Sequence, residues 1–347
     1  MRVLLTGSAG FIGSAVDRAL DAVGHEVVRV DALLPTAHRD PTPDEGTHVV
    51  DVRDADGWRG LMEGADVVCH QAAVVGAGVT TADLPLYAAH NDLGTAALLA
   101  AATEAGVDRV VLASSMVVYG EGAYACAEHG RLVPPARTPE ALAIGDFDVR
   151  CPHCARPVAS LLVDEDAALA PRNAYAASKV AQEHYSLAWA RQTGAAVVAL
   201  RYHNVYGAGM PRDTPYSGVA AMFRSSLERG EPPRVFEDGQ QRRDFVHVDD
   251  VARANLLAAT AVAAAAPGTF RAFNVASGHP VTVAEVAALV ARGAEHPLAP
   301  EVTGEYRLGD VRHVVASPAR ATAELGFRAE VAPTAGLPAF ATAPLRG

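Results

Sequence analysis

The sequence has almost no lysine. Among its 347 residues, 29 are Lys or Arg, and Lys179 is the only lysine, which leaves 28 arginines. An ammonium group can be tuned toward neutral pH, whereas a guanidinium stays charged. We therefore expect Lys179 to supply chemistry that arginine cannot, rather than to be a surface lysine retained by chance.

Positive charge and long apolar runs are scarce as well. The net charge is −11, which argues against a nucleic-acid partner because phosphate-backbone binding needs a basic surface. The first ten residues lack the pattern of a signal peptide. The alanine-rich stretch 251–267 is too short for a membrane span and contains Arg253. We expect a cytoplasmic protein with no membrane partner.

Apolar strand-like and helix-like segments alternate along most of the chain. The expected strands cover residues 3–5, 25–31, 65–71, 109–113 and 196–202, and the expected helices cover 11–23, 91–105 and 175–193. Repeated units of this size predict an α/β fold of the Rossmann type, with a doubly wound parallel sheet.

Two regions break this alternation. Residues 121–171 are rich in proline and glycine and contain three of the four cysteines, which indicates an insertion with its own cross-link. A turn-rich loop begins after Gly207, and the mixed segment behind it indicates a smaller substrate-binding lobe. We expect domains at 1–205, which includes the insertion, and at 206–347, interleaved with each other.

Three glycines follow the first expected strand. Gly7, Gly10 and Gly13 stand where a tight turn, close approach to a pyrophosphate and helix packing each need glycine, and the helix N-terminus favours an anion. Asp31 ends the second strand and can accept hydrogen bonds from ribose hydroxyls. Because Asp31 would repel a 2′-phosphate, the pattern favours NAD over NADP.

Tyr175 and Lys179 lie four residues apart on an expected helix and so share one face. A tyrosine of ordinary pKa is a poor base at neutral pH, but a neighbouring ammonium stabilises its phenolate. The pair could be an ordinary helix contact, and the uniqueness of Lys179 argues against that alternative.

Several further motifs occur along nearly the whole chain. With the glycine pattern and Tyr175/Lys179, they make the sequence resemble the extended short-chain dehydrogenase/reductase superfamily, and within it the NAD-dependent nucleotide-sugar epimerases and dehydratases. They are His70–Ala73, Asn91 with Gly94 and Thr95, Ser114–Gly120, Arg201–Gly207, Arg243–Asp250 and Tyr306–Asp310.

The resemblance implies a role for each matching position. Tyr175 would exchange a proton with a sugar hydroxyl, Ser115 would hydrogen-bond the same oxygen, and Lys179 would hold the nicotinamide ribose. The implied NAD-binding residues are Gly7, Gly10, Phe11, Ile12, Gly13, Asp31, Asp51, Val52, Gln71, Ala72, Ala73, Asn91, Ser114, Tyr175, Lys179, Tyr202 and Val205. The implied substrate-binding residues are Ser115, Met116, His203, Asn204, Arg243 and Arg307, of which the two arginines would neutralise a diphosphate. By the same analogy, helices near Asn91 and Tyr175 would form a homodimer contact.

The two residues after Ser115 reduce the number of reactions that the sequence allows. Dehydratases that resemble this chain have Asp and Glu there, whereas Met116 and Val117 transfer no proton. We therefore expect a 4-epimerase that oxidises a sugar carbinol and reduces the ketone from the other face. The Arg201–Gly207 motif, residues 210–215 and the insertion most resemble dTDP-L-rhamnose 4-epimerase-like proteins. A dehydratase, a 4-ketoreductase and a non-catalytic dinucleotide-sensing protein remain alternatives.

The insertion contains two pairs of possible metal ligands. Cys126 with His129 and Cys151 with Cys154 form C-x2-H and C-x2-C pairs separated by 21 residues, a pattern typical of a closed tetrahedral zinc site. We expect a structural zinc. The alternatives are no metal, or His153 in place of His129. Cys69 lies in an expected strand and is expected to be a core residue.

Overall fold

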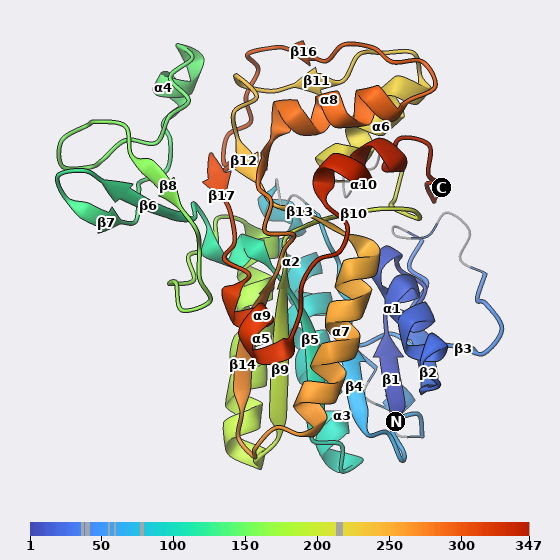
Figure 1. The fold of residues 1–347 in the computed structure, drawn as a ribbon. Coiled ribbons are helices and arrows are strands. Elements are labelled where there is room, and N and C mark those ends of the chain that lie inside the picture. Colours follow the sequence, from blue (N-terminus) through green and yellow to red (C-terminus); the bar gives the residue numbers. More distant parts are fainter. Residues whose placement is uncertain are drawn as a thin grey trace.

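The body of the molecule is a seven-stranded sheet in which all paired neighbours are parallel (Figure 1). The computed structural model describes every residue except 36, 37, 39–41, 55, 59, 77–79, 213–217 and 347. In spatial order the strands are β14 (Phe270–Val275), β9 (Ala196–Tyr202), β5 (Arg109–Ser115), β4 (Val67–His70), β1 (Arg2–Thr6), β2 (Glu26–Asp31) and β3 (Thr47–Val49). The expected α/β fold with a doubly wound sheet is confirmed.

Helices cover both faces of this sheet. Helices α1 (Phe11–Ala22) and α7 (Val248–Ala263) pack on one face, and α3 (Gly94–Glu104) and α5 (Ala174–Thr193) pack on the other. Because side chains alternate along a strand, Val3 and Leu5 join the core under α1 while Leu4 joins the core under α3. The strands are therefore apolar on both faces, which explains their continuous hydrophobic runs.

The strand order reverses between β1 and β4. The chain builds β2 and β3 on one side of β1, and β4, β5, β9 and β14 on the other. Loops that leave the carboxyl ends of β1 and β4 must diverge over opposite faces, so a crevice opens between them. This position places the glycine loop after β1 beside the segment that starts at Gln71.

The main sheet takes its edge strand from far along the chain. Strand β14 pairs with β9 over six residues, and α7 lies in the same layer as α1. Segments from beyond residue 205 thus complete the first sheet. The expected division at 205 into two interleaved domains stays a prediction.

A second lobe lies over the carboxyl end of the sheet (Figure 1). Its helices are α6 (Val219–Glu228), α8 (Val283–Gly293) and α10 (Pro333–Phe340), which share one apolar core. Its short strands pair as β10 (Asn204–Tyr206) with β13 (Phe245–His247), β11 (Arg234–Val235) with β16 (Glu301–Val302), and β12 (Arg242–Arg243) with β15 (Val281–Thr282) and β17 (His313–Val314). Helix α9 (Ala319–Leu325) returns to the main sheet.

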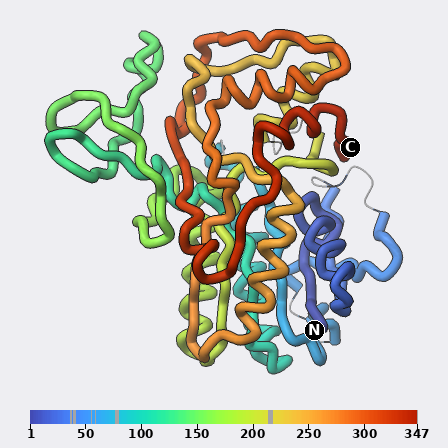
Figure 2. Tube along the Cα trace, viewed as in Figure 1, coloured from blue at the N-terminus to red at the C-terminus, as the bar shows by residue number. Residues whose placement is uncertain are grey.

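The insertion, residues 121–171, protrudes from the side of the molecule (Figure 2). It forms a three-stranded antiparallel sheet of β6 (Ala123–Cys126), β7 (Gly130–Leu132) and β8 (Ala159–Leu161), with the short helix α4 (Pro139–Ala143). Its small apolar cluster includes Ala123 and Val163. So small a core leaves most of the insertion's order to other contacts.

The remaining elements are short. The expected helix 91–105 is divided, because α2 (Leu84–Tyr87) runs into a π-helical turn, Ala88–Leu93, before α3 begins. Three 3-10 turns cover Asp56–Trp58, Thr81–Asp83 and Met116–Tyr119. Among the residues that the structure describes, no helix combines the length and apolarity that a membrane span needs. Positions 213–215 of the motif at 210–215 lie outside the described residues.

Candidate active site

A large pocket of 1090 Å³ occupies the crevice between the main sheet and the second lobe. Most of the residues predicted to bind the cofactor line it: Gly7, Gly10, Phe11, Ile12, Gly13, Asp31, Asp51, Val52, Gln71, Ala72, Ala73, Ser114, Tyr175, Lys179, Tyr202 and Val205. Asn204 and Arg307, predicted to bind substrate, line the same pocket. One continuous space therefore joins the glycine loop, the Tyr175/Lys179 pair and the second lobe.

The glycine loop fits a close-packed phosphate cradle. Gly7 adopts φ +67°, and a Cβ on it would lie 2.8 Å from the Ala72 amide nitrogen. A Cβ on Gly13 would overlap the Gly7 carbonyl oxygen. Because α1 begins directly after this loop, its free N–H groups face the pocket. The loop therefore suits a dinucleotide pyrophosphate.

Asp31 is held as a carboxylate at the end of β2. Its oxygens accept hydrogen bonds from the amides of Leu33 at 2.8 Å and Ala9 at 3.0 Å, and His38 lies 3.5 Å away. Burial alone would raise the pKa of Asp31, but the hydrogen bonds from His38 and the two amides keep it below its usual value. Next to it, Asp51 is ion-paired with Arg53 at 2.7 Å.

Tyr175 and Lys179 lie in the first turns of α5, which Asn173 caps by accepting a hydrogen bond from the Ala176 amide at 2.8 Å. Ser115, at the end of β5, lies beside the Tyr175 phenol and lowers its pKa. The Lys179 ammonium is 5.9 Å from the Tyr175 ring centroid and donates to the Ala113 carbonyl at 2.8 Å. Parallel pairing of β5 with β9 and packing of α5 against β5 bring these three side chains together.

Burial dominates the pKa of both groups. It raises the pKa of Tyr175 to about 12, while the neighbouring Ser115 hydroxyl opposes this shift. It lowers the pKa of Lys179 to about 7, while the nearby Glu183 carboxylate opposes this shift. The two titrating groups are thus shifted in opposite directions, which is typical of acid–base sites.

Five predicted residues do not line the pocket. Ser115 and Met116 lie at its edge, where Ser115 contacts Tyr175 and the Met116 sulfur accepts from Asn204 Nδ2 at 3.6 Å. Asn91 supports the wall, because its amide both accepts from and donates to the Val74 backbone, at 2.8 and 2.9 Å. Its predicted cofactor contact stays a prediction.

His203 and Arg243 are the other two. His203 is buried, and burial lowers its pKa to about 3, so the ring is neutral. The Arg243 guanidinium donates to the carbonyls of Arg242, Val311 and Arg312, at 2.5 to 2.9 Å. The Arg243 guanidinium is therefore hydrogen-bonded to backbone carbonyls and does not line the pocket. Arg307 does line the pocket, and its guanidinium lies 4.9 Å from the Phe236 ring centroid.

Comparison with known proteins decides the family. Residues 3–139 and 155–276 match the NAD dependent epimerase/dehydratase family. The chain belongs to this family. It is 32% identical over 339 residues to the dTDP-L-rhamnose 4-epimerase of Burkholderia thailandensis, covering 94% of this chain and 90% of that protein.

Solved structures of the family include epimerases and dehydratases. The UDP-glucose 4-epimerase of Thermus thermophilus in complex with NAD superposes with a TM-score of 0.73 at 33% identity, covering 98% of each chain. The dTDP-glucose 4,6-dehydratase of Streptomyces venezuelae with NAD bound gives 0.74 at 26% identity, covering 98% of this chain and 96% of the other. The expected family and NAD as its cofactor are confirmed.

The residues around the Tyr175/Lys179 pair include a buried ion pair, Arg201 with Glu183, that was not among the predicted site residues. Arg201 donates two hydrogen bonds to Glu183, at 2.9 and 2.7 Å, and Ser114 donates to the same carboxylate at 2.5 Å. Glu183 follows Lys179 by four residues, so the same helix-face argument could have found it. The pair holds the strand end that supplies Ser115.

Two further pocket residues, Arg346 and His38, were missed. Arg346 donates to the Ala9 carbonyl at 2.6 Å and lies 3.2 Å from His38 Nδ1. Both side chains line the dinucleotide end of the pocket. Neither stands in a recognisable motif, so the sequence offered no signal for them.

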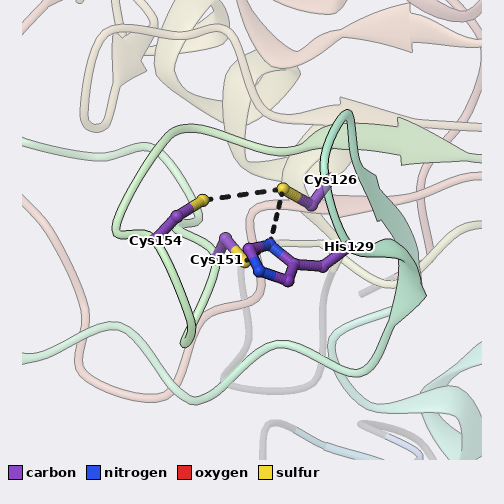
Figure 3. A group of neighbouring side chains, drawn as sticks. All are labelled: Cys126, His129, Cys151 and Cys154. Atoms are coloured by element: carbon purple, nitrogen blue, oxygen red, sulfur yellow. Dashed lines mark hydrogen bonds between the residues drawn. The ribbon is translucent and has the colours of Figure 1, made fainter.

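The four predicted metal ligands of the insertion come together (Figure 3). The ligand atoms of Cys126, His129, Cys151 and Cys154 all lie within 4.8 Å of one another. Cys126 Sγ is 3.5 Å from His129 Nδ1 and 3.7 Å from Cys154 Sγ, and Cys151 Sγ is 3.6 Å from His129 Nδ1. Cys69 is buried in the main core, as expected.

Proposed function

We propose that this chain is an NAD-dependent nucleotide-sugar 4-epimerase whose reacting groups are Tyr175, Ser115 and Lys179. The observation that carries this proposal is that Tyr175 and Lys179 line the same pocket as the glycine loop, with Ser115 beside the Tyr175 phenol. Bound NAD would supply the acceptor, and then the donor, for the hydrogen on the sugar carbon. The protein side chains must accept and return the proton of the sugar hydroxyl.

Tyr175 is placed to take the proton of the sugar hydroxyl and to return it. Its phenol is a weak base while neutral, so a positive charge must stabilise the phenolate. Lys179, 5.9 Å from the ring, is the cation at this position. Ser115 lies beside the phenol, and its hydroxyl can hydrogen-bond the substrate oxygen, which would keep the reacting oxygen beside Tyr175 in both halves of the cycle.

The surroundings of Ser115 favour epimerisation over dehydration. Elimination of water needs an acid and a base beside the keto sugar. Among the described residues that line the pocket, the carboxylates are Asp31, Asp51 and Asp310, and none follows Ser115. The positions after Ser115 hold Met116 and Val117, which have no ionisable group. A ketoreductase is a second candidate, and it predicts protein that purifies without NAD.

A nucleotide-sugar panel tests the reaction. We propose dTDP-L-rhamnose, or a related dTDP- or UDP-sugar, as substrate, on the strength of the similarity to the Burkholderia thailandensis enzyme. Incubation with each sugar, followed by ¹H NMR, is expected to show inversion at C4 without added NADH. Accumulation of a 4-keto-6-deoxy sugar from every active substrate would identify a dehydratase instead.

We also propose that the insertion binds one structural zinc through Cys126, His129, Cys151 and Cys154. A tetrahedral site with Zn–S near 2.3 Å and Zn–N near 2.0 Å places sulfur atoms about 3.8 Å apart and sulfur about 3.5 Å from nitrogen. The separations of 3.7 Å between sulfurs and 3.5 and 3.6 Å to nitrogen match these values. Metal analysis of untagged protein should find about one zinc per chain, and Cys151→Ser should lose it.

We propose a homodimer through the face formed by α2, the π-helical turn and α5. Leu84, Leu86, Leu93 and Tyr185 expose large apolar surfaces there, with Leu93 57% exposed. Grouped exposed apolar side chains are typical of protein contacts. Light scattering should give twice the chain mass for the wild type and less for Leu93→Asp.

A further inference from the structure

A cluster of buried charges joins the insertion to the second lobe. Arg137, between β7 and α4 of the insertion, forms a two-pronged ion pair with Glu237 of the second lobe, with both nitrogen–oxygen distances at 2.8 Å. The side chains are 4% and 1% exposed. Such a pair excludes water and fixes geometry, because removing either partner leaves an uncompensated buried charge.

The rest of the Arg137 guanidinium reaches two other segments. It donates to the Phe147 carbonyl of the insertion at 3.1 Å and to the Asp310 carbonyl at 2.7 Å. Asp310 belongs to the loop of residues 303–312, which connects β16 to β17. One planar group therefore holds the insertion, Glu237 and the 303–312 loop at fixed distances from one another.

Glu237 is itself held in an unusual conformation. Its φ is +54°, in the left-handed region that side chains other than glycine rarely adopt. It also accepts a hydrogen bond from Arg312 at 3.0 Å, and its amide donates to the Glu305 carbonyl at 2.7 Å. Such a conformation persists only where the surroundings hold it, and here both ends of the 303–312 loop contribute.

The 303–312 loop contributes side chains to the wall of the pocket. Arg307 and Asp310 line the pocket. Arg243 is fastened to the same loop through the carbonyls of Val311 and Arg312. Arg243 and Arg307 are the two arginines predicted to neutralise a diphosphate. Both contact or belong to a loop to which Arg137 of the insertion is hydrogen-bonded.

We infer that Arg137 is a positioning residue, through which the insertion sets the affinity of the pocket for the nucleoside diphosphate part of the substrate. This inference rests on the proposed function, because it takes the ligand of Arg307 to be a diphosphate. Arg137 acts through the 303–312 loop and is not among the described residues that line the pocket. The cofactor end of the pocket lies on the main sheet and is not part of this connection.

The test compares Arg137→Ala and Arg137→Lys with Arg131→Ala. Arg131 is an arginine of the same insertion that forms an exposed ion pair with Asp164 at 3.5 Å. Calorimetry with dTDP and with UDP measures the nucleotide affinity, and calorimetry with NAD measures the cofactor affinity. Hydrogen exchange of residues 303–312 measures the loop directly, without any ligand.

We expect Arg137→Ala to weaken nucleotide binding about tenfold or more, to speed exchange in residues 303–312, and to leave NAD affinity unchanged. Arg137→Lys should fall between it and the wild type, because an ammonium can pair with Glu237 but cannot span all three segments. Arg131→Ala should match the wild type. If Arg137→Ala does not fold, Arg137→Lys carries the same comparison.

Unchanged nucleotide affinity and loop exchange in a folded Arg137 variant would overturn the inference. Equal losses of nucleotide and NAD affinity would also overturn it, because they would indicate general destabilisation. If the wild type binds neither dTDP nor UDP while exchange of the loop still depends on Arg137, the proposed substrate class fails and the connection to the loop stands.

Discussion

The two parts of the molecule that carry chemistry-bearing side chains are ordered in different ways. Tyr175, Ser115 and Lys179 project from a twenty-residue helix and from a central strand, so regular structure and a large apolar core fix them. The insertion has three short strands and a small apolar cluster. There, the segments are joined by the Cys/His cluster, where we propose a zinc, and by the Arg137–Glu237 ion pair.

Because the two regions differ in this way, variants in them should affect different kinetic constants. Under the proposed function, a change at Tyr175 would remove the proton-transferring group and leave the scaffold intact. Under the further inference, a change in the insertion would leave the reacting groups in place and alter how the second lobe holds the substrate. We therefore expect the first kind of variant to lower kcat and the second to raise KM.

The largest effect is expected for Tyr175→Phe, which should lower kcat about 10³-fold because it removes the proton-transfer group. NAD binding, measured by calorimetry, should stay at the wild-type level. The matched control is Tyr185→Phe on the same helix, because its side chain is 49% exposed and phenylalanine keeps the aromatic ring that Tyr185 contributes to the proposed dimer face. A Tyr175→Phe enzyme with more than a tenth of wild-type kcat would exclude the assigned role.

Lys179→Arg should lower kcat about 10²-fold although it conserves charge. The ammonium is buried and donates to the Ala113 carbonyl at 2.8 Å, and a larger, planar guanidinium is not an equivalent donor at that position. Steady-state kinetics and cofactor content measure the loss. Near-normal rates would show that a positive charge is sufficient at this position. They would contradict the inference that Lys179 supplies chemistry that arginine cannot.

Cys151→Ser should raise KM for the nucleotide sugar about tenfold and leave kcat within about twofold. Loss of the proposed zinc would loosen the insertion that carries Arg137. Cys69→Ala is the control, because Cys69 lies in the main core outside the cluster. A fall in kcat with constant KM would contradict the division between the two regions.

The smallest expected effect is the pH dependence that Lys179 adds to the stability of the protein. Burial lowers the pKa of Lys179 to about 7 in the free protein, whereas in unfolded protein it should titrate near 10.4. Between these values the unfolded chain binds more protons, so this group's contribution to stability rises with pH from about 7 upward. Selective ¹³C-lysine labelling gives a single Cε signal, and a folded-state midpoint near 10 would contradict the buried site.

The sequence alone was sufficient for the local features. Gly7, Gly10, Gly13 and the Tyr175/Lys179 pair depend on spacing within one turn or helix, and the structure places all five around one pocket. The four cluster residues depend on two short pairs, and these also meet. The division of the expected helix 91–105 by a π-helical turn was missed, because a π-turn has no simple periodic signal.

Features that join distant segments were not predictable in the same way. Arg137 and Glu237 are 100 residues apart, and neither belongs to a motif. Arg243 was expected to face a diphosphate, but its guanidinium meets the carbonyls of Val311 and Arg312, whose positions depend on the folded lobe. Strand β14 likewise joins the first sheet from beyond residue 205, which no local pattern specifies.

The most direct test of the proposed reaction follows a deuterium label at C4 of the nucleotide sugar. We expect dTDP-L-rhamnose labelled with deuterium at C4 to yield the C4 epimer with the deuterium still at C4, and ¹H and ²H NMR to show no hydrogen from solvent on the sugar carbons. An epimer that had exchanged its C4 deuterium for solvent hydrogen, or a stable 4-keto product, would contradict reversible oxidation at the Tyr175 site.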